Sequence, residues 1–235
     1  MVTSGDLAGL AAVYIYVGLV VLTAAKLKFI RTAKMHRKFV HIMVGNIVFF
    51  WWLFDTSYIM AFLAAAPFIP LLLLASPYSN LSGLKNSFLG EATEESHDLG
   101  LVYYAISWTL LAFFLFDHRL VASIAIVAMS YGDGMGGLVG KRYGKRKING
   151  PKTLEGTLAV FFATVVATFV VIQFYQLLDS QMLLHAPLIG LASAALFSVL
   201  IGAFVAMVEL ITPGQYDNLV IPLGTAALLI SIGLG

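Results

Sequence analysis

The sequence predicts an all-α polytopic membrane protein, and this prediction rests on its composition. Of the 235 residues, 60% are hydrophobic and only 11% are charged, with a mean hydropathy of +0.92. These values lie outside the range of average soluble domains. Because unpaired backbone groups cannot face lipid, closely spaced apolar runs are expected to be helices rather than strands. We therefore expect a single transmembrane helical domain over residues 1–235.

Apolar runs long enough to cross about 30 Å of hydrocarbon predict a bundle of about eight spans, some of them short. Only "FDTSY" separates the second and third runs, and only "FDHRL" the fourth and fifth, so each pair should form a helical hairpin. The first run has no basic leader or evident cleavage site, so we interpret it as a retained span. The expected spans are 7–25, 39–54, 57–76, 99–116, 119–139, 157–178, 187–210 and 218–235.

The placement of basic residues predicts the orientation. Thirteen of the 14 Lys and Arg residues fall in loops that would share one face of the membrane, and only Arg119 falls on the other. By the positive-inside rule the basic face is cytoplasmic, and with eight spans both termini lie on the opposite side. Cytoplasmic loops are expected near 26–38, 77–98, 140–156 and 211–217. Cysteine is absent, which excludes disulfide and thiolate chemistry.

The first two cytoplasmic loops hold candidate ligand-binding residues. Cations at the end of a span commonly snorkel to headgroups, but His41 lies inside an apolar run, on one predicted helix face with Arg37 and Lys38. In the second loop the glutamates are typical of a solvated acidic segment, whereas His97 and Asp98 stand at a helix entrance. We expect these five residues to contact a polar ligand.

The stretch "SYGDGMGGLVGKRYGKRKINGPKTLEG", residues 130–156, combines glycines, one acid and many cations. Four glycines recur at four-residue spacing, a pattern that allows close helix packing. The neighbouring row contains Asp133, whose burial would cost several kcal/mol unless it is paired or bound to a cation. A salt bridge to Lys141 or a loop arginine therefore competes with metal or phosphate chemistry. The glycines are Gly132, Gly136, Gly140 and Gly144, and the neighbouring row is Asp133, Gly137, Lys141 and Lys145.

Two further segments carry signals of helix ends. Asn149-Gly150 predicts a turn before Pro151, and Thr153 and Glu155 suit the cap and first turn of the sixth span, where capping alone would explain both. Near the C-terminus, "VELITPGQYDNLVIPL" resembles a broken helix. Its polar residues are Glu209, which ends the seventh span, and Asp217 and Asn218, which open the eighth. Acids at this depth are functional candidates, although Asn218 could be a plain helix cap.

Together these residues could supply hard oxygen ligands for Mg²⁺, cations for a polyphosphate and an apolar bundle for a lipid tail. That combination suits phosphoryl transfer to a lipid alcohol. "GLVGKRYGK" is not a Walker A motif, and "GDGMGG" lies within a predicted membrane helix, so its GxGxxG spacing carries no weight. No repeat with matching Gly/Pro breaks indicates an inverted-repeat transporter.

The block "GDGMGGLVGKRYGK" followed by "KTLEGTLAVF" resembles the core of the CTP-dependent lipid-alcohol kinases. That family includes dolichol, phytol and farnesol kinases and the yeast-type CTP-dependent diacylglycerol kinase. "RKFVHI", "HDLGLVYYA" and "VELITPGQYDNLVIPL" are similar to the family's other blocks, in the same order. Relatives often have Ala-Asp where this chain has "GDG", and Lys-Ser-x-Glu-Gly-Ser where it has "KTLEGT"; both departures keep the acid, the lysine and the hydroxyl.

The resemblance implies a kinase that uses CTP and Mg²⁺ to phosphorylate an isoprenoid alcohol, such as dolichol, phytol or geranylgeraniol, in preference to diacylglycerol. The expected partners are this alcohol, CTP and membrane lipids, without nucleic acid, and a homodimer is compatible with the sequence. The expected roles are catalytic for Asp133, Glu209, Asp217 and His41; nucleotide binding for Gly137, Lys141, Arg142, Lys147, Lys152 and Glu155; lipid or phosphate contact for Arg37, Lys38, His97, Asp98 and Asn218; and metal binding for Asp133, Glu155 and Asp217.

Two other functions use the same residue types. A cytidylyltransferase that forms a CDP-activated lipid would also need a cytidine nucleotide, a metal ion and a lipid. A membrane transporter would use intramembrane acids and glycine-packed helices, but it would extend polar residues into the outer half of the bundle. There the sequence offers little beyond four aspartates, two histidines and Arg119.

Overall fold

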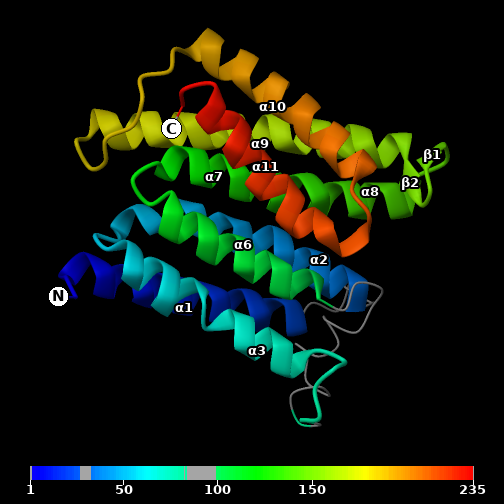
Figure 1. The fold of residues 1–235 in the computed structure, drawn as a ribbon, viewed down its shortest axis with the longest axis horizontal. Coiled ribbons are helices and arrows are strands. Elements are labelled where there is room, and N and C mark those ends of the chain that lie inside the picture. The colour runs from blue at the N-terminus through cyan, green and yellow to red at the C-terminus, as the bar shows by residue number, and fades with distance from the viewer. Residues whose placement is uncertain (1, 27–32, 82, 84–98, 235) are drawn as a thin grey trace. The chain divides into compact units, whose positions relative to one another are not determined.

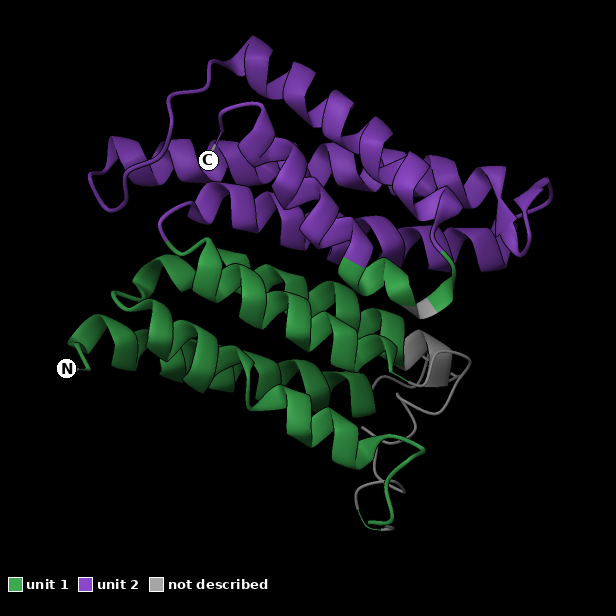
Figure 2. Cartoon of the chain, in the orientation of Figure 1, with its two compact units in different colours: residues 1–116, 213–219 green, residues 117–212, 220–235 purple. Residues whose placement is uncertain are grey.

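The computed structural model describes residues 2–26, 33–81, 83 and 99–234 (Figure 1). Among these residues, every regular element is helical except one two-stranded hairpin, so the all-α prediction is confirmed. The chain divides into two compact units, residues 1–116 with 213–219 and residues 117–212 with 220–235 (Figure 2). The single domain expected from the sequence stays a prediction, and each unit is described by itself.

The first unit contains α1, α2, α3 and α6, together with irregular helical segments. Pro67 explains one irregularity: it has no N–H and its ring crowds the carbonyl four residues earlier, that of Leu63. The chain forms a π-helical segment just before this proline, and the Tyr14 hydroxyl donates to the Leu63 carbonyl at 2.6 Å. The elements are α1 (Ser4–Lys26), α2 (Ala33–Val44), the 3-10 segments Gly45–Phe49 and Trp51–Leu53, the π-helical segment Ile59–Ala65, α3 (Phe68–Ala75), α6 (Gly100–Phe114) and the 3-10 turn Gly214–Tyr216.

One end of the first unit is fixed by a buried carboxylate. Asp6, in the first turn of α1, is fully buried and accepts backbone N–H bonds from Thr3, Asp55 and Thr56 at 3.0–3.2 Å. The Thr56 hydroxyl donates a further bond to the same carboxylate. These bonds hold the "FDTSY" turn against the start of α1, and they give Asp6 a structural role that its position in the sequence did not indicate.

The second unit is arranged around α9, which packs against α7, α8 and α10. α7 (Arg119–Val127), the π-helical segment Ala128–Asp133 and α8 (Gly134–Tyr143) follow one another without a break. Within the bundle, Ser123 and Tyr175 share a buried hydrogen bond of 2.8 Å. The other elements are β1 (Lys147–Asn149), β2 (Lys152–Thr153), α9 (Leu154–Ser180), α10 (Leu191–Ile211) and α11 (Asp217–Ser231), of which residues 217–219 belong to the first unit.

Each of the eight predicted runs contains helix, but the described residues include only four helices long and apolar enough to cross a membrane. These are Ser4–Lys26, Arg119–Tyr143, Leu154–Ser180 and Leu191–Ile211. Three apolar helices are shorter: Ile59–Ala75, Gly100–Phe114 and Asp217–Ser231. The structure is thus consistent with a membrane protein, while the number eight and the orientation stay predictions.

Candidate active site

The predicted close packing of the glycine row is confirmed in the second unit. A methyl group added at Gly132 would lie 2.6 Å from the Thr164 hydroxyl, and one added at Gly136 would overlap Val160. Gly144 faces Thr153, the cap of α9, in the same way. The row therefore allows the helix that carries Asp133 to lie directly against α9.

Asp133 ends the π-helical segment and is 8% exposed. A carboxylate oxygen of Asp133 lies within 4.8 Å of one from Glu209, near the end of α10. The two acids come from helices separated by all of α9 in the sequence. Two like charges at this distance repel each other in a buried setting, so the site favours a cation or proton between them.

Lys152 balances one of the two acids. Its ammonium lies 3.0 Å from Glu209 Oε1, and the two side chains are only 15% and 12% exposed. The same ammonium donates to the backbone carbonyls of Glu209 and Thr212, the latter at 2.8 Å. Lys152 thus satisfies the carboxylate and also caps the C-terminal end of α10, where the helix dipole favours a positive charge.

The hairpin that carries Lys152 is docked at this end of α10. The predicted turn is confirmed: Gly150 has a φ of +54°, and the strands pair Lys147 with Thr153 and Asn149 with Lys152. The Asn149 side-chain amide donates to the Leu210 carbonyl at 2.9 Å. These contacts join residues about 60 positions apart, and no local signal in the sequence indicated them.

The N-terminus of α9 is capped as the sequence predicted. The Thr153 hydroxyl accepts from the Gly156 N–H at 3.2 Å. Glu155, in the first turn, reaches back along the chain, and its Oε2 accepts the backbone N–H groups of Lys145 at 2.9 Å and Arg146 at 3.3 Å. The Glu155 carboxylate therefore orders the basic loop, and the structure groups Asp133 with Glu209 rather than with Glu155.

The predicted nucleotide-binding residues of the helix and loop are accessible. Gly137 and Lys141 are exposed on the row that begins with Asp133, and Lys147 is exposed on β1. The Arg142 guanidinium lies 5.4 Å from the centre of the Tyr143 ring. These residues form a cationic, solvent-facing surface that a polyphosphate could reach, on the same chain segment as Asp133.

In the first unit, the predicted polar residues lie at two places. His41 is 3% exposed, its ring centre is 4.4 Å from that of Tyr104, and its carbonyl accepts from the Tyr104 hydroxyl at 3.1 Å. Arg37 and Lys38 are half-buried on the same helix, α2. His41 therefore faces an apolar interior, a setting that its basic sequence neighbours did not suggest. His97 and Asp98 lie outside the described residues.

The start of α11 belongs to the first unit. Asp217 and Asn218 are 6% and 8% exposed, and the Asn218 carbonyl accepts from the Ser107 hydroxyl of α6 at 2.6 Å. The preceding Tyr216 stacks on Tyr103, with 5.8 Å between ring centres. α6 thus anchors the broken segment, and Asp217 is a buried acid as expected.

Asp133 and Glu209 bring two carboxylates together with the Lys152 ammonium in a nearly buried setting. Carboxylate oxygens are the ligands that Mg²⁺ prefers in proteins, and a pair of acids suits a divalent cation better than another anion. Asp133 and Glu209 could therefore hold a divalent metal ion. The exposed cations of the loop could bind the phosphates that accompany such an ion.

Comparisons with known proteins show similarity to kinases that act on isoprenoid alcohols. The chain is 32% identical over 226 residues to a phytol kinase from Synechocystis sp., an alignment that covers 93% of this chain and 88% of the relative. It is 31% identical over 155 residues to a probable chloroplastic phytol kinase 2 from Oryza sativa, covering 61% and 49% of the two chains. A chloroplastic farnesol kinase from Arabidopsis thaliana is 28% identical over 178 residues, covering 71% and 58%. No family model matches the chain, and no solved structure matches it.

The fold and the site define a helical membrane-type protein with a buried acid pair beside a cationic loop. The chain belongs to the lipid-alcohol kinase family of the phytol and farnesol kinases.

Proposed function

We propose that this protein transfers the γ-phosphoryl group of CTP to the hydroxyl of an isoprenoid alcohol at the cytoplasmic face of the membrane. The observation that carries the proposal is the pair of Asp133 and Glu209 carboxylates within 4.8 Å, with Lys152 bound to one of them. The relatives named phytol kinase and farnesol kinase support an isoprenoid alcohol as the acceptor, in preference to diacylglycerol.

In this reaction the alcohol oxygen attacks the γ-phosphorus and the bond from that phosphorus to the β–γ bridging oxygen breaks. CDP leaves, and the hydroxyl proton passes to a carboxylate. Asp133, Glu209 and Asp217 are the candidate acids for orienting the hydroxyl or accepting its proton. His41 is a candidate catalytic residue on the lipid side. Arg37, Lys38 and Asn218 are candidates for contact with the lipid or its phosphate.

Asp133 and Glu209 would hold a divalent cation, which we propose is Mg²⁺. When bound, this ion would neutralise negative charge on the phosphoryl group during transfer. Lys141, Arg142 and Lys147 would bind the triphosphate. Lys152 would hold the Glu209 carboxylate in place, and Glu155 would hold the basic loop in the conformation that presents its cations. Gly137 would leave room for a phosphate to approach the helix backbone.

Labelled CTP tests the reaction type. Purified protein is incubated with geranylgeraniol or phytol and with CTP labelled at either the γ- or the α-phosphate, and the lipid fraction is counted. A kinase places γ-label, but not α-label, in the lipid. Label from the α-phosphate would indicate a cytidylyltransferase, and no label in the lipid from any nucleoside triphosphate would favour a transporter. A panel of ATP, GTP, UTP and CTP tests the donor in the same assay.

Asp133→Asn tests the acid pair. We expect a loss of activity of about 10²–10³-fold, the scale for removing one group that stabilises the transition state, while the protein stays folded in the membrane. Asp117→Asn is the matched control, because Asp117 is exposed between α6 and α7 and should leave turnover unchanged. Full turnover in Asp133→Asn would mean that Asp133 is only a structural partner.

A further inference from the structure

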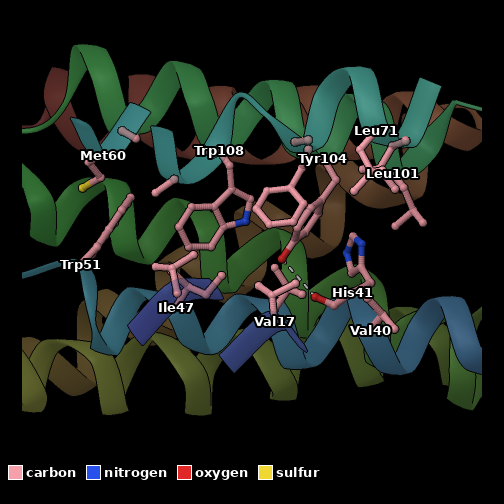
Figure 3. A pocket seen from close by; sticks show the side chains of 18 of the residues that line it. Val17, Val40, His41, Ile47, Trp51, Met60, Leu71, Leu101, Tyr104 and Trp108 are labelled. Atoms are coloured by element: carbon pink, nitrogen blue, oxygen red, sulfur yellow. Dashed lines mark hydrogen bonds between the residues drawn. The ribbon is translucent and has the colours of Figure 1, made fainter. Parts of the chain in front are cut away.

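The first unit encloses a cavity of about 170 Å³ between α1, α2, the segment 59–75 and α6 (Figure 3). Almost all of its surface is hydrocarbon or aromatic. Of the polar side chains on its wall, Trp108 has its indole nitrogen covered by other atoms, and Tyr104 donates its hydroxyl to the His41 carbonyl at 3.1 Å. The cavity therefore suits a hydrocarbon occupant and disfavours a hydroxyl or a charge.

The cavity is closed at one end and less covered at the other. At the closed end, Trp51, Phe54 and Met60 are at most 3% exposed. Val40 and Leu71 are half-buried, and Figure 3 shows them on the side of the space opposite Trp51 and Met60. The side marked by Val40 and Leu71 is therefore where a lipid chain can enter. Such a pocket receives the end of a chain, because a segment from its middle would need a second opening.

The volume limits what that chain end can be. An empty space of this size in a close-packed interior costs the surrounding side chains contacts, and water does not replace them because an apolar cavity stays dry. An apolar cavity of about 150 Å³ holds benzene, with six carbon atoms, so one near 170 Å³ holds roughly six or seven heavy atoms. The terminal isoprene unit of an isoprenoid chain has five carbons, one of them a methyl branch. The branch lets this unit fill the cavity better than a straight chain end of the same length.

We propose that this cavity binds the terminal isoprene unit of the lipid alcohol, at the end of the chain opposite the hydroxyl. The choice of an isoprenoid alcohol rests on the function proposed above. The hydroxyl then stays outside the cavity, where a nucleotide can reach it, as phosphoryl transfer requires. Because the site contacts only hydrocarbon, it selects by methyl branching and holds the alcohol and its phosphate monoester alike.

Tryptophan emission reports on the cavity without any nucleotide. Of the three tryptophans, Trp51 and Trp108 line the cavity, so in a Trp52→Phe background the remaining emission comes from its wall. Bromine quenches tryptophan at close approach and is about the size of a methyl group. Two brominated phytols are titrated into the full chain in lipid nanodiscs: one carries bromine in place of a terminal methyl group, and the other carries it beside the hydroxyl-bearing carbon. The proposal predicts saturable quenching by the first and only weak, non-saturable quenching by the second.

Competitors without bromine define what the site recognises. Phytol, phytyl monophosphate and the hydroxyl-free hydrocarbon phytane should relieve the quenching equally well. Hexadecanol has the same main chain without the branches and should compete about fourfold more weakly, the value of one buried carbon. Nanodiscs of dibrominated phosphatidylcholine test the other source of hydrocarbon. Quenching by these lipids that phytol cannot relieve would assign the cavity to acyl chains and overturn the proposal.

Two cavity variants and one control complete the test. Ala105 and Ala64 both line the cavity. Ala105→Leu takes up about half of the space and should weaken binding of the terminally brominated phytol by at least about tenfold. Ala64→Leu repeats the change at a second position and serves alone if Ala105→Leu does not fold. Ala11→Leu makes the same change at an exposed position of α1 and should have no effect.

Three results would each overturn the proposal: equal saturable quenching by both brominated phytols, competition by hexadecanol as strong as that by phytol, or Ala105→Leu behaving like Ala11→Leu. The outcome is separable from that of the kinase proposal. A protein that binds phytol in this way but phosphorylates no alcohol refutes the kinase alone. A protein whose preference for phosphorylating phytol over hexadecanol is unchanged in both cavity variants refutes the cavity site alone.

Discussion

Replacing Lys152 by methionine tests whether the hairpin and the acid pair form one structural unit. In the structure the Lys152 ammonium lies 3.0 Å from Glu209 Oε1 and also binds two backbone carbonyls at the end of α10. Methionine keeps most of the apolar stem but removes all of these bonds. The substitution leaves the Glu209 carboxylate without its ammonium partner, close to the Asp133 carboxylate.

The size of the effect follows from the burial of the pair. Removing one partner of a fully buried ion pair costs about 3–5 kcal/mol. The side chains here are 15% and 12% exposed, so some solvent screening remains and we expect a loss near the lower end, about 3 kcal/mol. For a chain of this size that corresponds to a fall in Tm of about 6–12 °C. Lys147→Met, an exposed position on the same hairpin, should change stability by less than about 0.5 kcal/mol.

Thermal unfolding of the purified variants in detergent micelles, without nucleotide, measures this difference. A double variant with Glu209→Gln completes the cycle: because the neutral amide no longer requires a cation, the combined loss should be about 1–3 kcal/mol smaller than the sum of the single losses. Equal Tm values for Lys152→Met and Lys147→Met would refute the reasoning. Strict additivity in the cycle would show that Lys152 and Glu209 do not interact.

Three further substitutions test other parts of the fold. Gly136→Ala should destabilise the protein by about 1–3 kcal/mol, because the new methyl overlaps Val160. Its control, Gly18→Ala, has open space around it and should be neutral or stabilising by up to about 1 kcal/mol. Both are measured as Tm shifts, and equal shifts would contradict the close packing at Gly136. Asp6→Ala should cost about 3 kcal/mol, since several donors lose a charged acceptor, and an unchanged Tm would contradict this. Glu155→Ala should release the basic loop and speed its cleavage by trypsin, and Glu155→Gln should be cleaved at an intermediate rate. Identical cleavage rates in the two variants and the unchanged protein would contradict the role of the carboxylate.

The sequence predicted those features that depend on residues close together in the chain. The four-residue glycine spacing, the Asn149-Gly150 turn and the Thr153 cap each follow from local geometry, and the structure confirms all three. The helical class followed from composition in the same way. The number of spans stays a prediction, because 3-10 and π-helical turns interrupt several apolar runs and leave regular helices shorter than the runs themselves.

The contacts that build the site could not be predicted, because they join distant segments. Lys152 and Glu209 are 57 positions apart, and their pairing depends on how α9 and α10 pack. The family resemblance implied that Lys152 binds the nucleotide and that Glu155 binds the nucleotide and the metal ion. The structure gives Lys152 a carboxylate partner and gives Glu155 two loop amides, so both residues act first on protein groups.

The distinction between structural and candidate functional acids in this protein follows from the groups around each carboxylate rather than from burial. Asp6 and Asp133 are both buried acids. Asp6 receives bonds from the backbone and side chains of two neighbouring segments, so its charge is already compensated and no ligand is needed. Asp133 instead lies within 4.8 Å of a second carboxylate, that of Glu209. A carboxylate bound by several donors is stabilised by the chain itself, whereas two carboxylates this close together favour a cation between them, so burial alone does not separate the two roles.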